Sequence, residues 1–235
     1  MNIAVVYGQK RRGNTWALTQ KFLEKIKTSD DKLTEFYLPD ERIGFCTGCF
    51  SCLLRGEGAC SHAEALREYT SAIDAADLLV FASPCYVRGM TGQLKTLFDH
   101  YAHRYMVHRP EASMFCKQAL AVSTAAGAGM NKTVNDIAGN FFWWGVARTY
   151  KFGLRMGAFD FEEISSKRKQ KIDRRVGRAA AKIKRDSGRA KAGLKTKIIF
   201  NMMRIYIKKN PGWSEADTAY WKERGWFGKG RPYKK

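Results

Sequence analysis

Apolar runs separated by polar, glycine-containing segments recur through the first two thirds of the chain. Ile3–Tyr7 is a continuous run rich in β-branched residues that ends at Gly8, which is typical of a strand buried on both faces of a parallel sheet. Similar runs predict four further strands, at Leu33–Leu38, Asp77–Ala82, Gln118–Thr124 and Val146–Phe152.

Between these runs the apolar residues recur at helical spacing. Trp16–Ile26 follows Asn14 and Thr15, either of which is placed to cap a helix. Five strands that alternate with helices predict an α/β fold with a doubly wound, five-stranded parallel sheet. In such a sheet the ligand binds at the carboxyl ends of the strands. The other predicted helices are Ala63–Ala75, Gln93–His103 and Asn131–Trp144.

The positive charge of the chain is concentrated in its last third. The formal net charge is +20, of which residues 161–235 contribute +16 and residues 1–160 only +4. Because the first part is nearly balanced, the charge does not indicate a nucleic-acid partner. Phe161–Ala192 is rich in Lys, Arg and Ala, a composition that favours helix. We therefore predict an α/β domain over residues 1–160 and a basic, mostly helical extension over residues 161–235.

The extension ends in an amphipathic segment and an aromatic one. Lys195–Lys209 carries cations beside apolar residues, so we expect a solvated basic face, with contact to acidic membrane lipids or to nucleic acid as the alternative. After a Pro-Gly break the chain is predicted to be loop-like, with aromatic residues at Trp213, Trp221, Trp226 and Tyr233.

The start of the chain lacks the charge order and cleavage site of a secretory signal peptide. No stretch of about 18 uncharged apolar residues, the length of a membrane span, occurs in the sequence. We therefore expect a cytoplasmic protein. In that compartment the six cysteines are reduced thiols or metal ligands rather than disulfides.

Three loops at the predicted carboxyl edge have the character of ligand-binding loops. Gly8–Thr15 joins a buried strand to a helix start, so its backbone N–H groups suit a phosphate monoester; a basic surface loop with a helix cap is the alternative. Ser83–Gln93 offers the flat face of Tyr86 beside exposed backbone, which suits a planar heteroaromatic ring. In Thr124–Gly129 small side chains let the backbone approach a ligand closely.

Together these loops resemble the signatures of flavodoxin-like NAD(P)H-dependent FMN reductases and iron–sulfur flavoproteins. Gly8–Thr15 is similar to the phosphate loop Gly-Ser-Pro-Arg-Lys-Gly-Asn-Thr of that family, and Ser83-Pro84-x-Tyr86 and Gly92-Gln93-Leu94-Lys95 are similar to two further motifs. The likeness covers roughly residues 1–150 and implies a flavodoxin-like sheet.

The resemblance implies a bound FMN, with its phosphate at Arg11, Asn14 and Thr15 and its ring against Pro84–Val87 and Thr124–Gly127. It also implies an oxidoreductase that passes hydride from NAD(P)H to the flavin and on to a second acceptor, such as a quinone, a flavin or a protein. No catalytic side chain is expected, because the flavin carries the chemistry. A homodimer or higher oligomer is expected by the same resemblance. The implied cofactor-binding residues are Gln9, Arg11, Asn14, Thr15, Pro84, Cys85, Tyr86, Val87, Thr124, Ala125, Ala126 and Gly127.

The sequence also departs from the family pattern. Gln9 and Lys10 stand where the family has Ser-Pro, and Ala126-Gly127 stands where paired glycines are common. These departures motivate an alternative function, a binding module that kept the fold and lost the flavin.

Four cysteines form the most distinctive local pattern, Cys46-x2-Cys49-x2-Cys52-x7-Cys60. Three thiols spaced three residues apart, with a fourth from a following loop, suit iron–sulfur ligation. The resemblance implies a four-iron four-sulfur cluster, and with it the alternative function of an electron-transfer protein. Free thiols and zinc binding stay open as alternatives.

Three histidines lie close together in the sequence, at His100, His103 and His108. No Asp, Glu or Cys completes a metal-ligand set with them at short spacing, so we expect surface or dimer-interface histidines rather than metal ligands.

Overall fold

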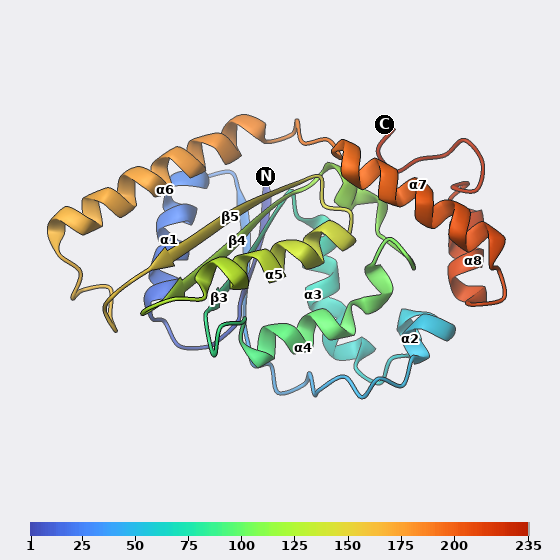
Figure 1. Ribbon diagram of the computed structural model, residues 1–235, viewed down its shortest axis with the longest axis horizontal. Helices are drawn as coiled ribbons and strands as arrows, with labels where there is room; N and C mark the ends of the chain where they lie inside the picture. Colours follow the sequence, from blue (N-terminus) through green and yellow to red (C-terminus); the bar gives the residue numbers. More distant parts are fainter. Residues whose placement is uncertain (235) are drawn as a thin grey trace.

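The computed structural model describes residues 1–234 and contains a five-stranded, all-parallel sheet (Figure 1). The strand order is β2-β1-β3-β4-β5, the doubly wound order in which the winding reverses beside the first strand. The α/β, flavodoxin-like fold class expected from the sequence is thereby confirmed. The strands are β1 Asn2–Tyr7, β2 Lys32–Tyr37, β3 Leu78–Pro84, β4 Gln118–Ala125 and β5 Arg148–Arg155.

Helices cover both faces of the sheet (Figure 1). Alternate residues of a strand point to opposite faces, so Val6 belongs to one apolar cluster and Val5 to the other. Helices α3, α4 and α5 pack on the first face, and α1 and α6 pack on the second. The helices are α1 Asn14–Ile26, α2 Ser51–Leu54, α3 Ala63–Ala75, α4 Gly92–His100, α5 Met130–Trp143, α6 Ser166–Asp186, α7 Leu194–Lys209 and α8 Glu215–Glu223.

The predicted bounds of two elements are wrong by a few residues. The last strand was expected from Val146, but the N–H of Val146 donates to the carbonyl of Phe141 at 3.0 Å and so closes the end of α5. The strand consequently begins at Arg148 and reaches Arg155, three residues beyond the expected end. Helix α4 stops at His100, and a separate 3-10 turn follows at residues 102–104.

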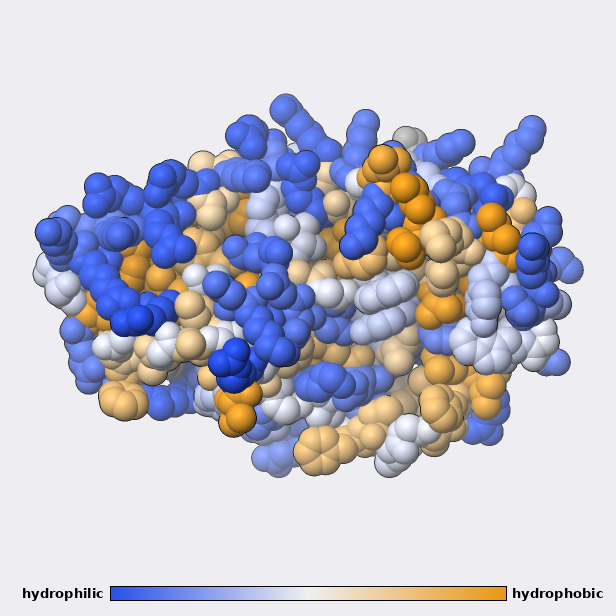
Figure 2. All heavy atoms as spheres, in the orientation of Figure 1, coloured by the Kyte–Doolittle hydropathy of each residue, from blue (hydrophilic) through white to orange (hydrophobic). Residues whose placement is uncertain are grey.

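The basic extension packs in two different ways. On α6 the apolar residues lie on one side and join the sheet and α1 in a single cluster, while the basic side faces solvent at the upper left of Figure 2. Helices α7 and α8 instead form a third cluster, in which Phe200 stacks on Trp221 with a centroid distance of 4.9 Å. The division of the chain at residue 160 stays a prediction. The apolar residues of α6 in the shared cluster are Ile172, Val176, Ala180 and Ile183.

The aromatic end predicted as loop-like contains helix α8. The hydroxyl of Ser214 accepts a hydrogen bond from the N–H of Asp217 at 3.1 Å, and acidic residues occupy the first turn. Both features stabilise a helix N-terminus, which explains why a short helix forms there.

On α7 five large hydrophobic side chains are exposed among lysines, and orange spheres mark an apolar surface over this helix (Figure 2). Contact of this face with lipid stays a prediction. Within residues 1–234 no helix is long and apolar enough to cross a membrane. The exposed residues are Leu194, Ile198, Met202, Ile205 and Tyr206.

Candidate functional site

The loops after β1, β3, β4 and β5 meet at one edge of the sheet and enclose a cavity of about 200 Å³. We refer to this edge as the rim. Ten of the twelve predicted cofactor-binding residues line the cavity, whereas Val87 and Gly127 do not. The role of these twelve residues in binding a cofactor stays a prediction. The ten residues are Gln9, Arg11, Asn14, Thr15, Pro84, Cys85, Tyr86, Thr124, Ala125 and Ala126.

The loop after β1 leaves a run of backbone N–H groups without partners. Gly8 packs tightly against the loop after β3: its carbonyl accepts from Thr91 Oγ1 at 2.7 Å, and a Cβ at position 8 would lie 2.6 Å from that oxygen. Beyond Gly8, the N–H groups of residues 9–16 donate to no acceptor in the described chain, and α1 has no side-chain cap. Unpaired amides at a helix N-terminus attract an anion, so this loop fits the phosphate end of FMN.

The polar side chains of the same loop contact the loop after β5 and the end of β4. Arg11 pairs with Asp160 at 3.2 Å, and Asn14 Nδ2 donates to the carbonyls of residues 158 and 159 at 3.1 and 2.9 Å. The Thr15 hydroxyl is buried and lies 2.6 Å from the hydroxyl of Thr124. The free donors at this position are therefore the backbone amides rather than the side chains.

The contribution of the β5 loop to the cavity was not predicted. Met156, Ala158 and Phe159 line it, although no motif marks this segment. Only the sheet topology could have indicated this contribution, because the carboxyl ends of all parallel strands lie at the same edge of the sheet.

The loop after β3 contains a strained turn. Val87 and Arg88 have φ values of +47° and +65°, and Tyr86 and Gly89 exchange two backbone hydrogen bonds around them. A left-handed conformation is costly for a β-branched residue, and such strain is concentrated at ligand sites. Tyr86 is 52% exposed and hydrogen-bonds Gln9 through its hydroxyl. The turn thus presents an exposed aromatic face beside the cavity, where a planar ring would bind.

The four-cysteine motif lies on the long connection between β2 and α3. Cys46 and Cys49 are exposed, and Cys52 and Cys60 are half-buried. Burial raises the pKa of Cys52, and the nearby thiols of Cys60 and Cys46 raise it further. Hydrogen bonding between its thiol and Ser51 lowers the pKa of Cys49. The donor set fits an iron–sulfur cluster in type and number, but among residues 1–234 no three of these sulfurs lie within 4.8 Å of one another.

The expectation that the histidines lie at the surface is wrong for two of them. His100 and His103 are buried, at 3% and 7% exposure. Burial and the charge of Arg104 lower the pKa of His103 to about 3, so this imidazole is neutral. His100 lies beside Cys60, with Nδ1 and Sγ 3.9 Å apart, a proximity that their 40-residue separation in sequence hides.

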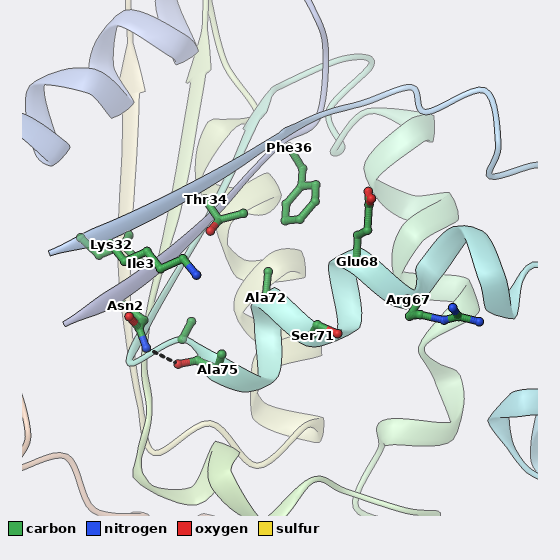
Figure 3. Close-up of a pocket in the computed structure, with 11 residues that line it drawn as sticks. Asn2, Ile3, Lys32, Thr34, Phe36, Arg67, Glu68, Ser71, Ala72 and Ala75 are labelled. Atoms are coloured by element: carbon green, nitrogen blue, oxygen red, sulfur yellow. Dashed lines mark hydrogen bonds between the residues drawn. The ribbon is translucent and has the colours of Figure 1, made fainter.

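A second hollow, of about 590 Å³, lies between β2 and α3 (Figure 3). Asn2 Nδ2 donates to the carbonyl of Ala75 at 3.1 Å at one end, and Phe36 and Ala72 form an apolar wall. Its lining contains no cysteine, no histidine and no residue of the predicted set. This hollow therefore lies apart from the rim and from the cysteine motif.

The sheet order and the unpaired amides at the carboxyl end of β1 define a flavodoxin-like nucleotide-binding protein. NADPH-dependent FMN reductases match residues 1–151, and the chain belongs to that family. The expected class of enzyme, an NAD(P)H-dependent FMN oxidoreductase, is thereby confirmed.

Known proteins resemble the chain over most of its length. An iron–sulfur flavoprotein of Archaeoglobus fulgidus is 22% identical over 233 residues, which is 96% of this chain and 99% of the relative. An FMN-dependent NADH-azoreductase of Bacillus anthracis, solved with FMN, superposes with a TM-score of 0.58 at 12% identity, covering 78% of this chain and all of the other. An NAD(P)H:quinone oxidoreductase of Methanothermobacter marburgensis has a TM-score of 0.58 at 16% identity, covering 77% and 95%. These two structures show the same fold.

Proposed function

We propose that the rim binds FMN and that the protein passes hydride equivalents from NAD(P)H through it to a second small-molecule or protein acceptor. The observation that carries this proposal is the unpaired run of amides at residues 9–16, placed beside the strained, aromatic turn after β3. FMN, when bound, supplies the acceptance and release of hydride.

The chain itself holds and orients the cofactor. The amides of residues 9–16 bind the phosphate, assisted by the N-terminal dipole of α1. Tyr86 provides an aromatic face for the ring, and the small residues Ala125 and Ala126 let the end of β4 approach it. Thr15 and Thr124, joined through their hydroxyls, fix the first loop to the end of β4.

Purification of the full-length protein tests this proposal. We expect about one FMN per chain, released by acid, and bleaching of the flavin absorbance by NADH or NADPH under anaerobic conditions. Reoxidation is then followed with quinones, azo compounds and free flavin as acceptors. A protein that retains no FMN and does not take it up would support the binding-module alternative and contradict the proposal.

A second candidate is electron transfer between the flavin and an iron–sulfur cluster on Cys46, Cys49, Cys52 and Cys60. It is favoured by the four-thiol donor set and by the similarity, along nearly the whole chain, to a protein named an iron–sulfur flavoprotein. Anaerobically purified protein would then contain about four iron and four acid-labile sulfide per chain. Iron-free protein that resists reconstitution with iron and sulfide would exclude it.

A further inference from the structure

We propose that helix α7 binds the surface of a membrane that contains anionic lipids, with its exposed apolar side chains among the lipid headgroups and its lysines beside the lipid phosphates. These exposed side chains form a stripe along the helix, since the first three are spaced four residues apart and so lie on one face. We refer to them as the outer stripe. They are Leu194, Ile198, Met202, Ile205 and Tyr206.

The outer stripe lies opposite the side of α7 that packs in the core. Ile198 and Ile207 are nine residues apart, which is about two and a half turns of an α-helix, so their side chains point in opposite directions. Ile207 is 4% exposed and belongs to the third apolar cluster, whereas Ile198 is 51% exposed. A helix that packed only on this protein would be polar on its outer side. The packing of residues 1–234 therefore does not explain the outer stripe, and a contiguous apolar surface of this kind marks an interaction site.

The stripe continues into the aromatic segment after the helix. Trp213 is exposed, and its ring lies edge-on to that of Tyr206 with a centroid distance of 5.7 Å. Tyr and Trp combine an apolar ring with a polar group at one edge, and they concentrate at the level of the lipid headgroups in membrane proteins. The end of the stripe thus carries side chains suited to the boundary between membrane and water.

The charge around the outer stripe complements an anionic surface. Residues 187–214 contain seven Lys and Arg and no Asp or Glu. Lys208 and Lys209 are exposed in the last turn, and hydrophilic side chains border the apolar surface over α7 on both sides (Figure 2). A helix with basic residues beside an apolar face binds in the plane of a membrane, through burial of the apolar face and attraction to anionic headgroups.

Two other occupants of the stripe fit less well. A second copy of the chain, which has a net charge of +20, would bring the same acid-free surface against the first, so the lysines would repel one another. Nucleic acid offers phosphates to the lysines, but its sugar–phosphate backbone offers no apolar surface to five exposed hydrophobic side chains. A bilayer with anionic lipids accommodates both the charges and the apolar side chains.

A membrane contact at α7 leaves the rim open. Phe200 of α7 packs edge-on against Phe115, with ring centroids 5.4 Å apart, and Phe115 precedes the start of β4. The helix therefore lies at the amino ends of the strands, whereas the rim lies at their carboxyl ends (Figure 1). Lipid binding by α7 is consequently independent of the proposed binding of FMN, and either can fail without the other.

The test is co-sedimentation of the full-length protein with lipid vesicles at low ionic strength. We expect binding to vesicles of equal parts phosphatidylcholine and phosphatidylglycerol, little binding to phosphatidylcholine alone, and release by added salt. The double variant Ile198→Ser with Met202→Ser should weaken binding about tenfold or more, because it removes apolar surface from the stripe. The matched control, Ile198→Leu with Met202→Leu, keeps that surface and should bind as the wild type does.

The contribution of charge is measured with a second pair of variants. Lys208→Gln with Lys209→Gln should weaken binding about tenfold. Lys25→Gln with Lys27→Gln makes the same change in net charge at the end of α1 and should have little effect. Thermal melting of each variant shows whether it folds.

No binding of the wild type to the anionic vesicles, or unchanged binding by the folded serine variant, would overturn the proposal. So would equal losses in the two lysine variants, which would reduce the effect to attraction by net charge. An oligomer that the serine variant dissociates in sedimentation velocity, without vesicle binding by the wild type, would assign the stripe to a second copy. Binding of duplex DNA in place of vesicles, lost in the serine variant, would assign it to nucleic acid.

Discussion

The rim and the cysteine–histidine end of the molecule are built in opposite ways. At the rim, each residue lies within eight positions of the end of its own strand, and the donors are mostly backbone amides. At the other end, the short helix α2 is fixed by residues far away in sequence. Buried Arg109 donates to the carbonyls of Cys52 and Leu53 and pairs with Asp217 of α8.

The sheet positions the loops of the rim, whereas the C-terminal extension positions the cysteine segment. A doubly wound sheet brings loops to one edge whatever their sequence, so the rim needs only suitable loop residues. The cysteine end has no strand beneath it and depends on the extension: Ser214 donates to the carbonyl of Leu53 at 2.9 Å, and Trp221 of α8 is fully buried. We infer that α7 and α8 serve to order the cysteine segment, while α6 completes the core.

The largest expected effect is that of Asp217→Ala. Asp217 and Arg109 are 3% and 5% exposed, and the loss of one partner leaves the other charge buried and unpaired, at a cost of about 3–5 kcal/mol. We expect that loss in the free energy of unfolding measured with urea, and weakened binding of an iron–sulfur cluster with FMN content preserved. Glu215→Ala, which removes an exposed acid from the same helix, should cost less than about 1 kcal/mol. Equal losses in both variants would contradict the special role of the buried pair.

The rim is tested next by the double variant Arg11→Ala with Thr15→Ala. Loss of the Arg11 charge beside the phosphate, and of the Thr15 hydroxyl that fixes this loop to the end of β4, should together weaken FMN binding by about 2–4 kcal/mol. The measurement is the dissociation constant of FMN from flavin-fluorescence quenching on apo-protein. Metal binding at the cysteine end should be unchanged. Unaltered flavin affinity would remove both side chains from the site and leave phosphate binding to the backbone amides alone.

The rim could be predicted from the sequence, whereas the arrangement of the cysteine end could not. The three rim loops could be brought together from sequence because strand periodicity fixes where each strand ends. The fourth loop was missed because the last strand runs to Arg155 rather than to Phe152, and nothing in Ala158-Phe159-Asp160 indicates a site. The meeting of Cys60 with His100 depends on the course of the long connection after β2 and on how α3 packs beside α4. No local pattern encodes either of these.

Asp40 lies on the segment that joins the two ends, and its titration tests how firmly that segment is held. Hydrogen bonds from Arg42 lower its pKa to about 2, and the Tyr69 hydroxyl contributes at 3.1 Å. Because the folded pKa lies below the unfolded value near 4, the unfolded chain takes up the proton first as the pH falls. Stability is therefore present above about pH 4 and is lost toward pH 2. Arg42 is 57% exposed, so solvent screening limits the contribution to about 1 kcal/mol.

The measurement is urea unfolding of the wild type and of Asp40→Asn at pH 6 and pH 3. The wild type should be the more stable protein at pH 6, and the difference should shrink at pH 3. A difference that is independent of pH would show that Asp40 acts through packing rather than through its charge.

The smallest expected effect is that of Asp160→Asn, which should strengthen FMN binding rather than weaken it. Asp160 pairs with Arg11 at 3.2 Å across the cavity and so competes with a phosphate for the same guanidinium. Both side chains are more than half exposed, so Asp160→Asn should tighten FMN binding by only about 0.5 kcal/mol, a gain that high salt should reduce. Asp173→Asn is the matched control, because it makes the same charge change at the Lys21–Asp173 pair between α1 and α6. A gain in Asp160→Asn alone would show that Arg11 is shared between the loop after β5 and the phosphate. An equal gain in the control would show that the effect comes from net charge alone. Arg11 would then pair with the loop after β5 and make no contact with the phosphate.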